Sequence, residues 1–418
     1  MNLRVRNAIF SNQLSERRIV LVFGFITIFF TSVFLLRFNS EFGGAKYDSQ
    51  FYVRMYEYIQ NYKSFIPLNS YEVSSSPIFV HAFGFFLLLF GDLYPIVLTL
   101  SFIVMAAASV ILFEKLIKQA PLNIKIILTT MFCGSGYFVA PMLNPTSDSP
   151  MILCLILSLY AFSFARRKLM SISLFCLVSV RQSLGWILVV FVVWDLYNMW
   201  KFRNISFRDI LWTYSISFVS LFATFIYFNN NLYPVSYTEV WPGIVFNVPN
   251  FLSVVQIGIS LLVLLTPLLI LGFETIKISK DSKLLMLYFS VLSFAAIVFP
   301  QKKPIVEGLG YLSVLNGNFD FAIVQLSAIS ALGFLVFLVL AHEWISNGKS
   351  FLFLFMFAFV TSSLLMPIPF LRYFQIPLIL AVVLIFKSPR IGFKRRNDLV
   401  AYSVVSFLIL FNLGSIAL

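Results

Sequence analysis

Two aspartates, Asp48 and Asp148, occupy the positions in this sequence that are best suited to acid-base chemistry. Asp48 stands just before a segment with helical spacing, and Asp148 precedes an apolar run in LNPTSDSP. A carboxylate at either place could cap the free backbone donors of the following helix. It could also act as a general base on a hydroxyl group if it faced a cavity. Local sequence leaves both interpretations open for each aspartate.

Cations in short polar segments form a second group of candidates. Arg181 and Gln182 interrupt an apolar stretch, where a charged group is costly and usually faces a cavity or a partner. The alternative is an interfacial turn with a snorkelling arginine. Arginine and lysine also suit an anionic group such as a phosphate, or lipid phosphate in general. The further candidates for such a binding site are Lys302, Lys303, Glu307, Arg372, Tyr373 and His81.

The motifs of soluble enzymes are missing from the chain. There is no GxSxG, Walker loop, HExxH or GxGxxG in a strand-helix setting. The two histidines, His81 and His342, are too few for a multi-histidine metal site and favour packing or interface roles. The sequence indicates no cofactor. It is compatible with a divalent cation but contains no motif that indicates one.

Composition defines the elements that must position these residues. The chain has 418 residues, of which 60% are hydrophobic and 11% charged, with mean hydropathy +0.92. Soluble domains carry about a quarter charged residues, so this composition predicts a polytopic membrane protein. The net charge of +13 is typical of cytoplasmic loops in such a protein, and a nucleic-acid partner is excluded.

Apolar runs long enough for transmembrane helices divide the chain into about 13 spans, each requiring about 20 residues. They are 18–36, 94–113, 126–141, 150–165, 169–182, 183–199, 210–228, 251–271, 284–300, 320–340, 350–367, 373–387 and 399–416. We therefore predict an all-α transmembrane bundle, with residues 1–418 forming one membrane-embedded domain.

Charge decides whether segment 76–91 also crosses. If it does not, most basic residues fall on one side, including those at 166–168 and 394–396. Counting it as a crossing would place the later basic clusters outside, against the positive-inside bias. We therefore expect a cytoplasmic amino terminus, an external carboxyl terminus and a first external loop at 37–93.

The first external loop contains a predicted amphipathic surface helix. Its sequence YDSQFYVRMYEYIQNYKSF places apolar residues at helical spacing, namely Phe51, Met55, Tyr58, Ile59 and Tyr62. Asp48 would lie at the amino end of this helix.

The order of these segments resembles the GT-C superfamily of membrane glycosyltransferases, which use polyprenyl-phosphate sugars as donors. The matching stretches are AKYDSQFYVRMYEYI, SSSPIFVHAFGFFLLLFGDLYP and LNPTSDSPMILCLILSLYAF. SVRQSLGWILVV and FLRYFQIPLILAVVLIF are most similar to the dolichyl-phosphate-glucose α-1,2-glucosyltransferases, which carry comparable Arg-Gln and Arg-Tyr segments. Tyr52 stands where that pattern often has a histidine.

The resemblance implies a hexosyltransferase acting on the external face, with glucose as one candidate sugar. It implies that Asp48 is the catalytic carboxylate and Asp148 a second acidic residue near the active cavity. Donor phosphate or acceptor sugar would meet Arg181, Gln182, Arg372 and Tyr373. The expected partners are a polyprenyl-phosphate-linked sugar, a glycan acceptor and membrane lipid. The expected location is a bacterial inner membrane with a periplasmic active face, or the endoplasmic reticulum in a eukaryote.

Two other functions compete with this one. An O-antigen-type polysaccharide polymerase would depend on external cations more than on Asp48. A lipid-linked-glycan flippase or another transporter would perform no chemistry, and often shows corresponding broken spans in two halves. No such internal symmetry is visible in the sequence.

Overall fold

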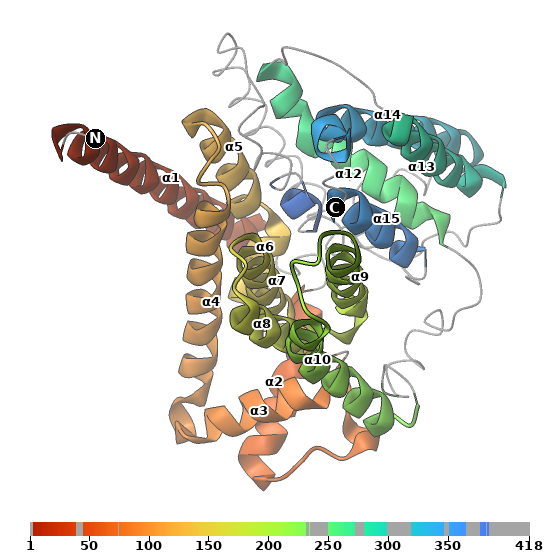
Figure 1. Ribbon diagram of the computed structural model, residues 1–418. Coiled ribbons are helices and arrows are strands. Elements are labelled where there is room, and N and C mark those ends of the chain that lie inside the picture. Colours follow the sequence, from red (N-terminus) through yellow and green to blue (C-terminus); the bar gives the residue numbers. More distant parts are fainter. Residues whose placement is uncertain are drawn as a thin grey trace.

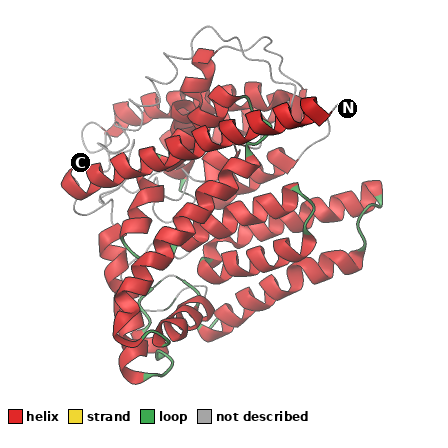
Figure 2. Ribbon diagram, turned by 90° about the vertical axis from the view of Figure 1, so that its left-hand side faces the viewer, coloured by secondary structure: helices red, strands yellow, loops and turns green. Residues whose placement is uncertain are grey.

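The protein is helical throughout the part of the chain that the structure describes. The computed structural model describes residues 3–38, 45–73, 75–230, 234, 250–271, 280–298, 319–346, 351–364, 377–381 and 383. Every regular element in these ranges is a helix (Figure 1). Figure 2 shows the same helices and their connecting loops from a direction turned by 90°. The predicted all-α class is thus confirmed for the described residues.

The first helix, α1 (Leu3–Phe38), packs against α4 (Tyr94–Leu116), α5 (Leu122–Cys133) and α6 (Gly136–Leu143). Gly24 permits the close approach, because a Cβ atom there would lie 3.1 Å from Thr129 Cγ2 and 3.3 Å from Val110 Cγ1. The opposite side of α1 exposes large apolar side chains, including Phe29 and Phe30. An exposed apolar face of this kind suits contact with lipid.

The first external loop of the prediction forms a small layer at one end of α4 (Figure 1). It consists of α2 (Ala45–Tyr62), the short helix η2 (Leu68–Ser70), α3 (Pro77–Leu88) and the short helix η3 (Gly91–Leu93). Ser76 caps α3 by accepting a hydrogen bond from the Ile78 backbone N–H, with Pro77 in the first helical turn.

Helix α2 forms over the predicted segment and buries one side in the protein. Tyr52, Met55, Tyr56 and Ile59 are buried against α3, whereas Tyr62 is exposed. Of the predicted apolar residues, Met55 and Ile59 are buried and Tyr62 is exposed, because aromatic residues occur on both sides of this helix. Its contact with the bilayer surface stays a prediction. Its buried side packs on protein.

Helix α3 spans 12 residues. At about 1.5 Å per residue it is about 18 Å long, well short of the roughly 30 Å of a bilayer core. This length agrees with the prediction that segment 76–91 does not cross.

The central helices are α7 (Asp148–Ser163), α8 (Arg167–Val180), α9 (Gly185–Phe202) and α10 (Phe207–Tyr227), with the short helix η4 (Gln182–Leu184) between α8 and α9. Helix α8 lies between α7 and α10 and contacts both. The carboxyl-terminal part of the described chain adds α12 (Phe251–Leu271), α13 (Lys280–Val298), α14 (Phe319–Ser346) and α15 (Phe351–Ser363).

Aromatic side chains join α15 to the central helices. The rings of Phe162 and Phe351 stack with centroids 4.3 Å apart, and Trp186 meets Phe355 edge-on at 5.3 Å. Such pairs stabilise packing beyond the area that they bury. Residues from both groups of helices belong to one buried apolar core.

Among the described residues, four helices are long and apolar enough to cross a membrane. They are Gly91–Leu116, Gln182–Phe202, Phe207–Tyr227 and Ala322–Ala341. A fifth span is obtained if Leu122–Cys133 and Gly136–Leu143 form one bent crossing. The count of about 13 spans stays a prediction.

The span predicted at 126–141 is broken in the structure. Helices α5 and α6 meet at an angle of 49°. The break falls at Gly134 and Ser135, where Gly134 ends α5 and the extended backbone of Ser135 starts α6. Breaks in apolar helices leave backbone groups that neighbouring protein must satisfy. Both residues are buried.

Candidate functional site

Two of the predicted site residues, Asp148 and Arg181, form a buried ion pair. Arg181 Nη2 donates to Asp148 Oδ1 at 2.7 Å, and Arg181 Nη1 donates to Ser147 Oγ at 3.3 Å. Arg181 is 7% exposed and Asp148 is 6% exposed. A charge-assisted hydrogen bond in such a site is stronger than one between neutral groups. Arg181 is therefore not a snorkelling side chain of a simple interfacial turn.

The chain breaks at the position of this arginine. Helix α8 ends at Val180, and Arg181 has extended backbone with φ −147° and ψ 93°. The backbone N–H of Arg181 still donates to the Leu177 carbonyl, so the helix end is satisfied. The predicted interruption between two apolar segments is confirmed, and it aims the guanidinium at the first turn of α7.

Tyr52 of α2 connects the first loop to the same ion pair. Its hydroxyl donates to Ser147 Oγ at 2.8 Å and lies 2.6 Å from Ser75 Oγ. Burial raises the pKa of Tyr52 above its ordinary value, so the phenol keeps its proton and remains a donor. We call Tyr52, Ser75, Ser147, Asp148 and Arg181 the Asp148 cluster.

Asp48 lies in α2, one helical turn before Tyr52. The helix begins at Ala45, so Asp48 stands inside its first turns, whereas the sequence placed it just before the helix. The side chain of Asp48 lies outside the described residues. Its role as the catalytic carboxylate stays a prediction.

His81 of α3 is buried and has a partner for each ring nitrogen. The Ile66 backbone N–H donates to Nε2 at 2.9 Å, and Nδ1 lies 2.7 Å from the Pro77 carbonyl oxygen. Nδ1 therefore carries the proton, and the ring is neutral. Burial lowers the pKa of His81. This geometry favours a positioning role, in which His81 holds the segment that follows α2 against α3.

The remaining predicted residues divide into two groups. Gln182 is buried at the start of η4, directly after Arg181. The others, namely Lys302, Lys303, Glu307, Arg372 and Tyr373, lie outside the described residues. Their proximity to the Asp148 cluster stays a prediction.

Sequence reasoning missed three hydroxyl groups of the Asp148 cluster, those of Tyr52, Ser75 and Ser147. The available signals were weak: Tyr52 follows Asp48 by one helical turn, and Ser147 immediately precedes Asp148. Further hydroxyl pairs connect neighbouring helices, including Ser76 with Thr224 at 2.7 Å between their oxygens.

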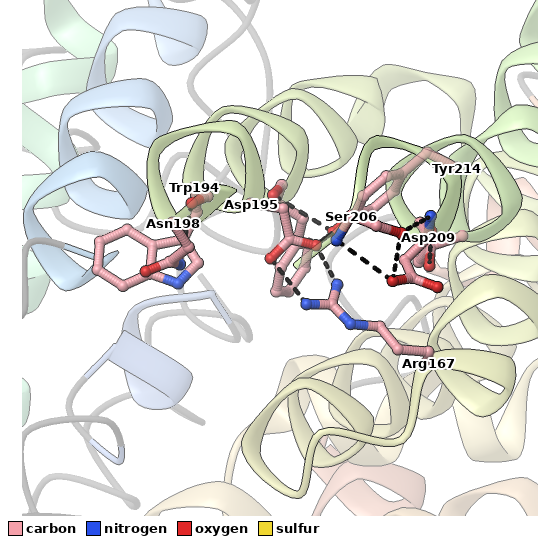
Figure 3. Close-up of polar contacts among 9 residues, drawn as sticks. Arg167, Trp194, Asp195, Asn198, Ser206, Asp209 and Tyr214 are labelled. Atoms are coloured by element: carbon pink, nitrogen blue, oxygen red, sulfur yellow. Dashed lines mark hydrogen bonds and ion pairs between the residues drawn. The ribbon is translucent and has the colours of Figure 1, made fainter. Parts of the chain in front are cut away.

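A second polar cluster joins α8, α9 and α10 near the amino end of α8 (Figure 3). Arg167 forms a bidentate ion pair with Asp195, with Nη2 donating to Oδ1 at 3.1 Å. The Tyr214 hydroxyl donates to Asp195 Oδ2 at 2.6 Å. Asp195 is 1% exposed, and its charge is fully engaged by these two neighbours. This geometry ties three helices together, and the signal for it was a lone aspartate in the apolar run GWILVVFVVWDLYNMW.

The two clusters differ in what they can do chemically. The second pairs its two charges with each other in a network that ties three helices together. The Asp148 cluster combines a carboxylate, a cation and three hydroxyls at the meeting point of α2, α7 and η4. Such a set can hold hydroxyl and anionic groups by hydrogen bonding. Among the described residues, no three His, Cys, Asp or Glu side chains gather as metal ligands would.

Comparison with protein-family models, curated proteins and solved structures finds no match for this chain. The resemblance to the GT-C superfamily therefore stays an expectation drawn from short segments of sequence. The functional proposal depends on the residues and contacts described above.

Proposed function

We propose that this protein is a multi-pass membrane glycosyltransferase that transfers a hexose from a polyprenyl-phosphate sugar to a glycan acceptor. The observation that supports the proposal is the Asp148 cluster. It brings together α2, the LNPTSDSP turn and the Arg-Gln turn, which are three of the segments that carry the GT-C resemblance. These contacts join residues 95 and 33 positions apart in the chain.

The proposed reaction needs one base and a set of cations. The Asp48 carboxylate takes the proton of an acceptor hydroxyl, whose oxygen forms a bond to the anomeric carbon of the donor sugar. The bond between that carbon and the phosphate oxygen breaks, and the electron pair leaves with the polyprenyl phosphate. General-base catalysis contributes about 10²–10⁴-fold, and cations stabilise the charge of the leaving group.

The ion pair between Asp148 and Arg181 positions this machinery in the proposal. Because Asp148 already balances Arg181, the leaving phosphate requires further positive charge. Lys302, Lys303 and Arg372 are the proposed source. Arg181 and the hydroxyls of Tyr52 and Ser147 remain the polar wall against which the sugar binds.

Membrane embedding forms part of substrate binding in this proposal. The polyprenyl tail lies between spans, while its head group reaches the external end of the bundle. We place the protein in a bacterial inner membrane with a periplasmic active face, or in the endoplasmic reticulum of a eukaryote. Glucose is one candidate for the transferred hexose.

The test compares two variants, each of which replaces one aspartate of the first external loop by asparagine. Asp48→Asn is expected to lower sugar transfer by about 10²–10⁴-fold, because the amide cannot accept the proton of the acceptor. Asp92→Asn makes the same chemical change at an exposed position in η3 and is expected to leave transfer near the wild-type rate.

Transfer is measured with purified protein, a polyprenyl-phosphate sugar and a glycan acceptor. Monodisperse elution in detergent confirms that each variant is folded. A folded Asp48→Asn protein that transfers sugar at the wild-type rate would contradict the assignment of the base.

A further inference from the structure

A shallow groove lies on the outer surface of α10, close to the start of the helix. It has a volume of about 330 Å³ and is lined by Phe207, Arg208, Leu211, Trp212 and Ser215. Trp212 is 71% exposed, and Phe207 is also exposed. The groove belongs neither to the Asp148 cluster nor to the buried core.

The groove changes character along the helix. A capping box between Ser206 and Asp209 marks the beginning of α10 and places Arg208 in the first turn. Leu211, Trp212 and Ser215 follow over the next two turns, on the way into an apolar helix long enough to cross a membrane. One end therefore offers the Arg208 cation beside the Phe207 ring, and the other offers the aromatic and aliphatic surface of Trp212 and Leu211.

The charge around the groove is positive. Ser171 Oγ of α8 donates to the Trp212 carbonyl at 3.3 Å, which places α8 beside the groove. Lys168 lies one helical turn before Ser171 and is exposed. The exposed cations at this end of α8, α9 and α10 are Arg166, Lys168, Lys201, Arg203 and Arg208.

The acidic groups nearby are already engaged (Figure 3). The Asp209 carboxylate accepts hydrogen bonds from the Ser206 hydroxyl at 2.6 Å and from the Ser206 backbone N–H at 3.3 Å. Asp195 is buried against Arg167 and Tyr214. Asp209 is exposed and adjacent to Arg208 in the chain, so its charged carboxylate offsets part of the positive charge of Arg208. The exposed cations at this end of the three helices outnumber it, and the groove remains positive.

We propose that this groove binds an anionic membrane phospholipid. The headgroup phosphate contacts the Arg208 guanidinium, with Lys168 at its side, and one acyl chain lies along Leu211, Trp212 and Ser215. A cation followed by apolar surface along a membrane-spanning helix matches the order of groups in such a lipid. The proposal depends on α10 crossing the membrane and is independent of transferase activity.

Brominated lipids test the proposal, because bromine quenches nearby tryptophan. The full chain is reconstituted in vesicles that contain either dibrominated phosphatidylglycerol or dibrominated phosphatidylcholine. The chain has 6 tryptophans, so the difference between wild type and Trp212→Phe isolates the signal of Trp212. The matched control is Trp200, which is 80% exposed at the end of α9 and does not line the groove.

We define the preference of a tryptophan as the ratio of its quenching by dibrominated phosphatidylglycerol to its quenching by dibrominated phosphatidylcholine. We expect Trp212 to show a clear preference for the anionic lipid and Trp200 to show a smaller one. Arg208→Gln lowers the Trp212 preference about fivefold, equivalent to about 1 kcal/mol for one basic residue at an anionic surface. Arg203→Gln, which removes an exposed cation outside the groove, leaves it unchanged.

Equal quenching of Trp212 by the two lipids would overturn the proposal, as would an Arg208→Gln protein with an unaltered preference. Loss of the preference on adding excess inorganic phosphate would also overturn it, because the site would then bind a free anion. Both tryptophans and both arginines are exposed, so none of these substitutions disturbs the core.

Discussion

At the scale of single residues, the partner of a buried charge decides its role. Asp148 and Arg181 each balance the other, and the hydroxyls of Tyr52 and Ser147 surround them. An unpaired charge in the same place would be strongly destabilising, since burial removes it from water without compensation. Both the local structure and the proposed site therefore depend on this ion pair.

Arg181→Met tests this dependence. The substitution leaves the Asp148 carboxylate buried without its cation, and we expect a loss of about 3–5 kcal/mol in unfolding free energy. The double variant Arg181→Met with Asp148→Leu should recover most of that loss, because both charges are gone. Thermal and denaturant unfolding in detergent measure the effect, and a single variant as stable as wild type would argue against a buried, coupled pair.

His81 should make the first loop sensitive to pH. Its pKa is lowered from 6.5 in the folded protein, so the unfolded chain binds the proton more readily. Above about pH 6.5 the histidine is neutral in both the folded and the unfolded chain, and the stabilising contribution of the neutral ring is complete. That contribution is lost as the pH falls through the lowered pKa of the folded protein. Protonated Nε2 can no longer accept the hydrogen bond from the Ile66 backbone N–H.

Hydrogen exchange reports this change directly. After correction for intrinsic rates, the Ile66 amide should exchange faster as pH falls from about 7.5 to about 5.5. The Tyr71 amide, which donates to the Leu68 carbonyl, serves as the control in the same loop. Ile66 protection that is independent of pH would exclude His81 as its partner.

At the scale of elements, small residues allow two helices to approach closely. Gly258 of α12 and Gly333 of α14 face each other, and a Cβ atom on Gly333 would collide with the Gly258 carbonyl oxygen and approach Leu262 N at 3.1 Å. Ser293 and Ser330 add a hydrogen bond of 2.9 Å between α13 and α14. Close backbone contact through small residues is a common basis of helix association in membranes.

Gly333→Ala is expected to destabilise this contact by about 1–3 kcal/mol or more, because backbone atoms must move to admit the methyl group. Gly185→Ala is the matched control. Its Cβ atom would meet Leu221 Cδ1 at 3.4 Å, an ordinary contact with a flexible side chain. Melting temperatures in the same detergent compare the two, and equal values would mean that α12 and α14 can separate at little cost.

At the scale of the whole molecule, apolar side chains cover both the interior and much of the outside. Phe30 of α1, Val104 of α4 and Phe222 of α10 are exposed, while the core between the helices is equally apolar. An exterior of this kind suits contact with lipid. The several apolar helices long enough to span a membrane agree with this arrangement.

The sequence by itself determined the helical class, the membrane character and many of the helix positions. It also determined the interruption at Arg181, because a charged residue followed by a polar one cannot continue an apolar span without cost. Helix bounds follow from local composition, capping residues and prolines, all of which act over a few residues.

Only the tertiary structure decided which polar groups meet. Asp148 pairs with Arg181, 33 residues later in the chain, and Tyr52 donates to Ser147, 95 residues later. The His81 ring contacts the Ile66 backbone N–H and the Pro77 carbonyl oxygen. The physical reason is that these helices are apolar on nearly every side, so hydrophobic contrast does not identify the packing face. Helix α2 illustrates this, since its aromatic residues occur on both sides and packing on α3 selected Tyr52 and Tyr56 for burial.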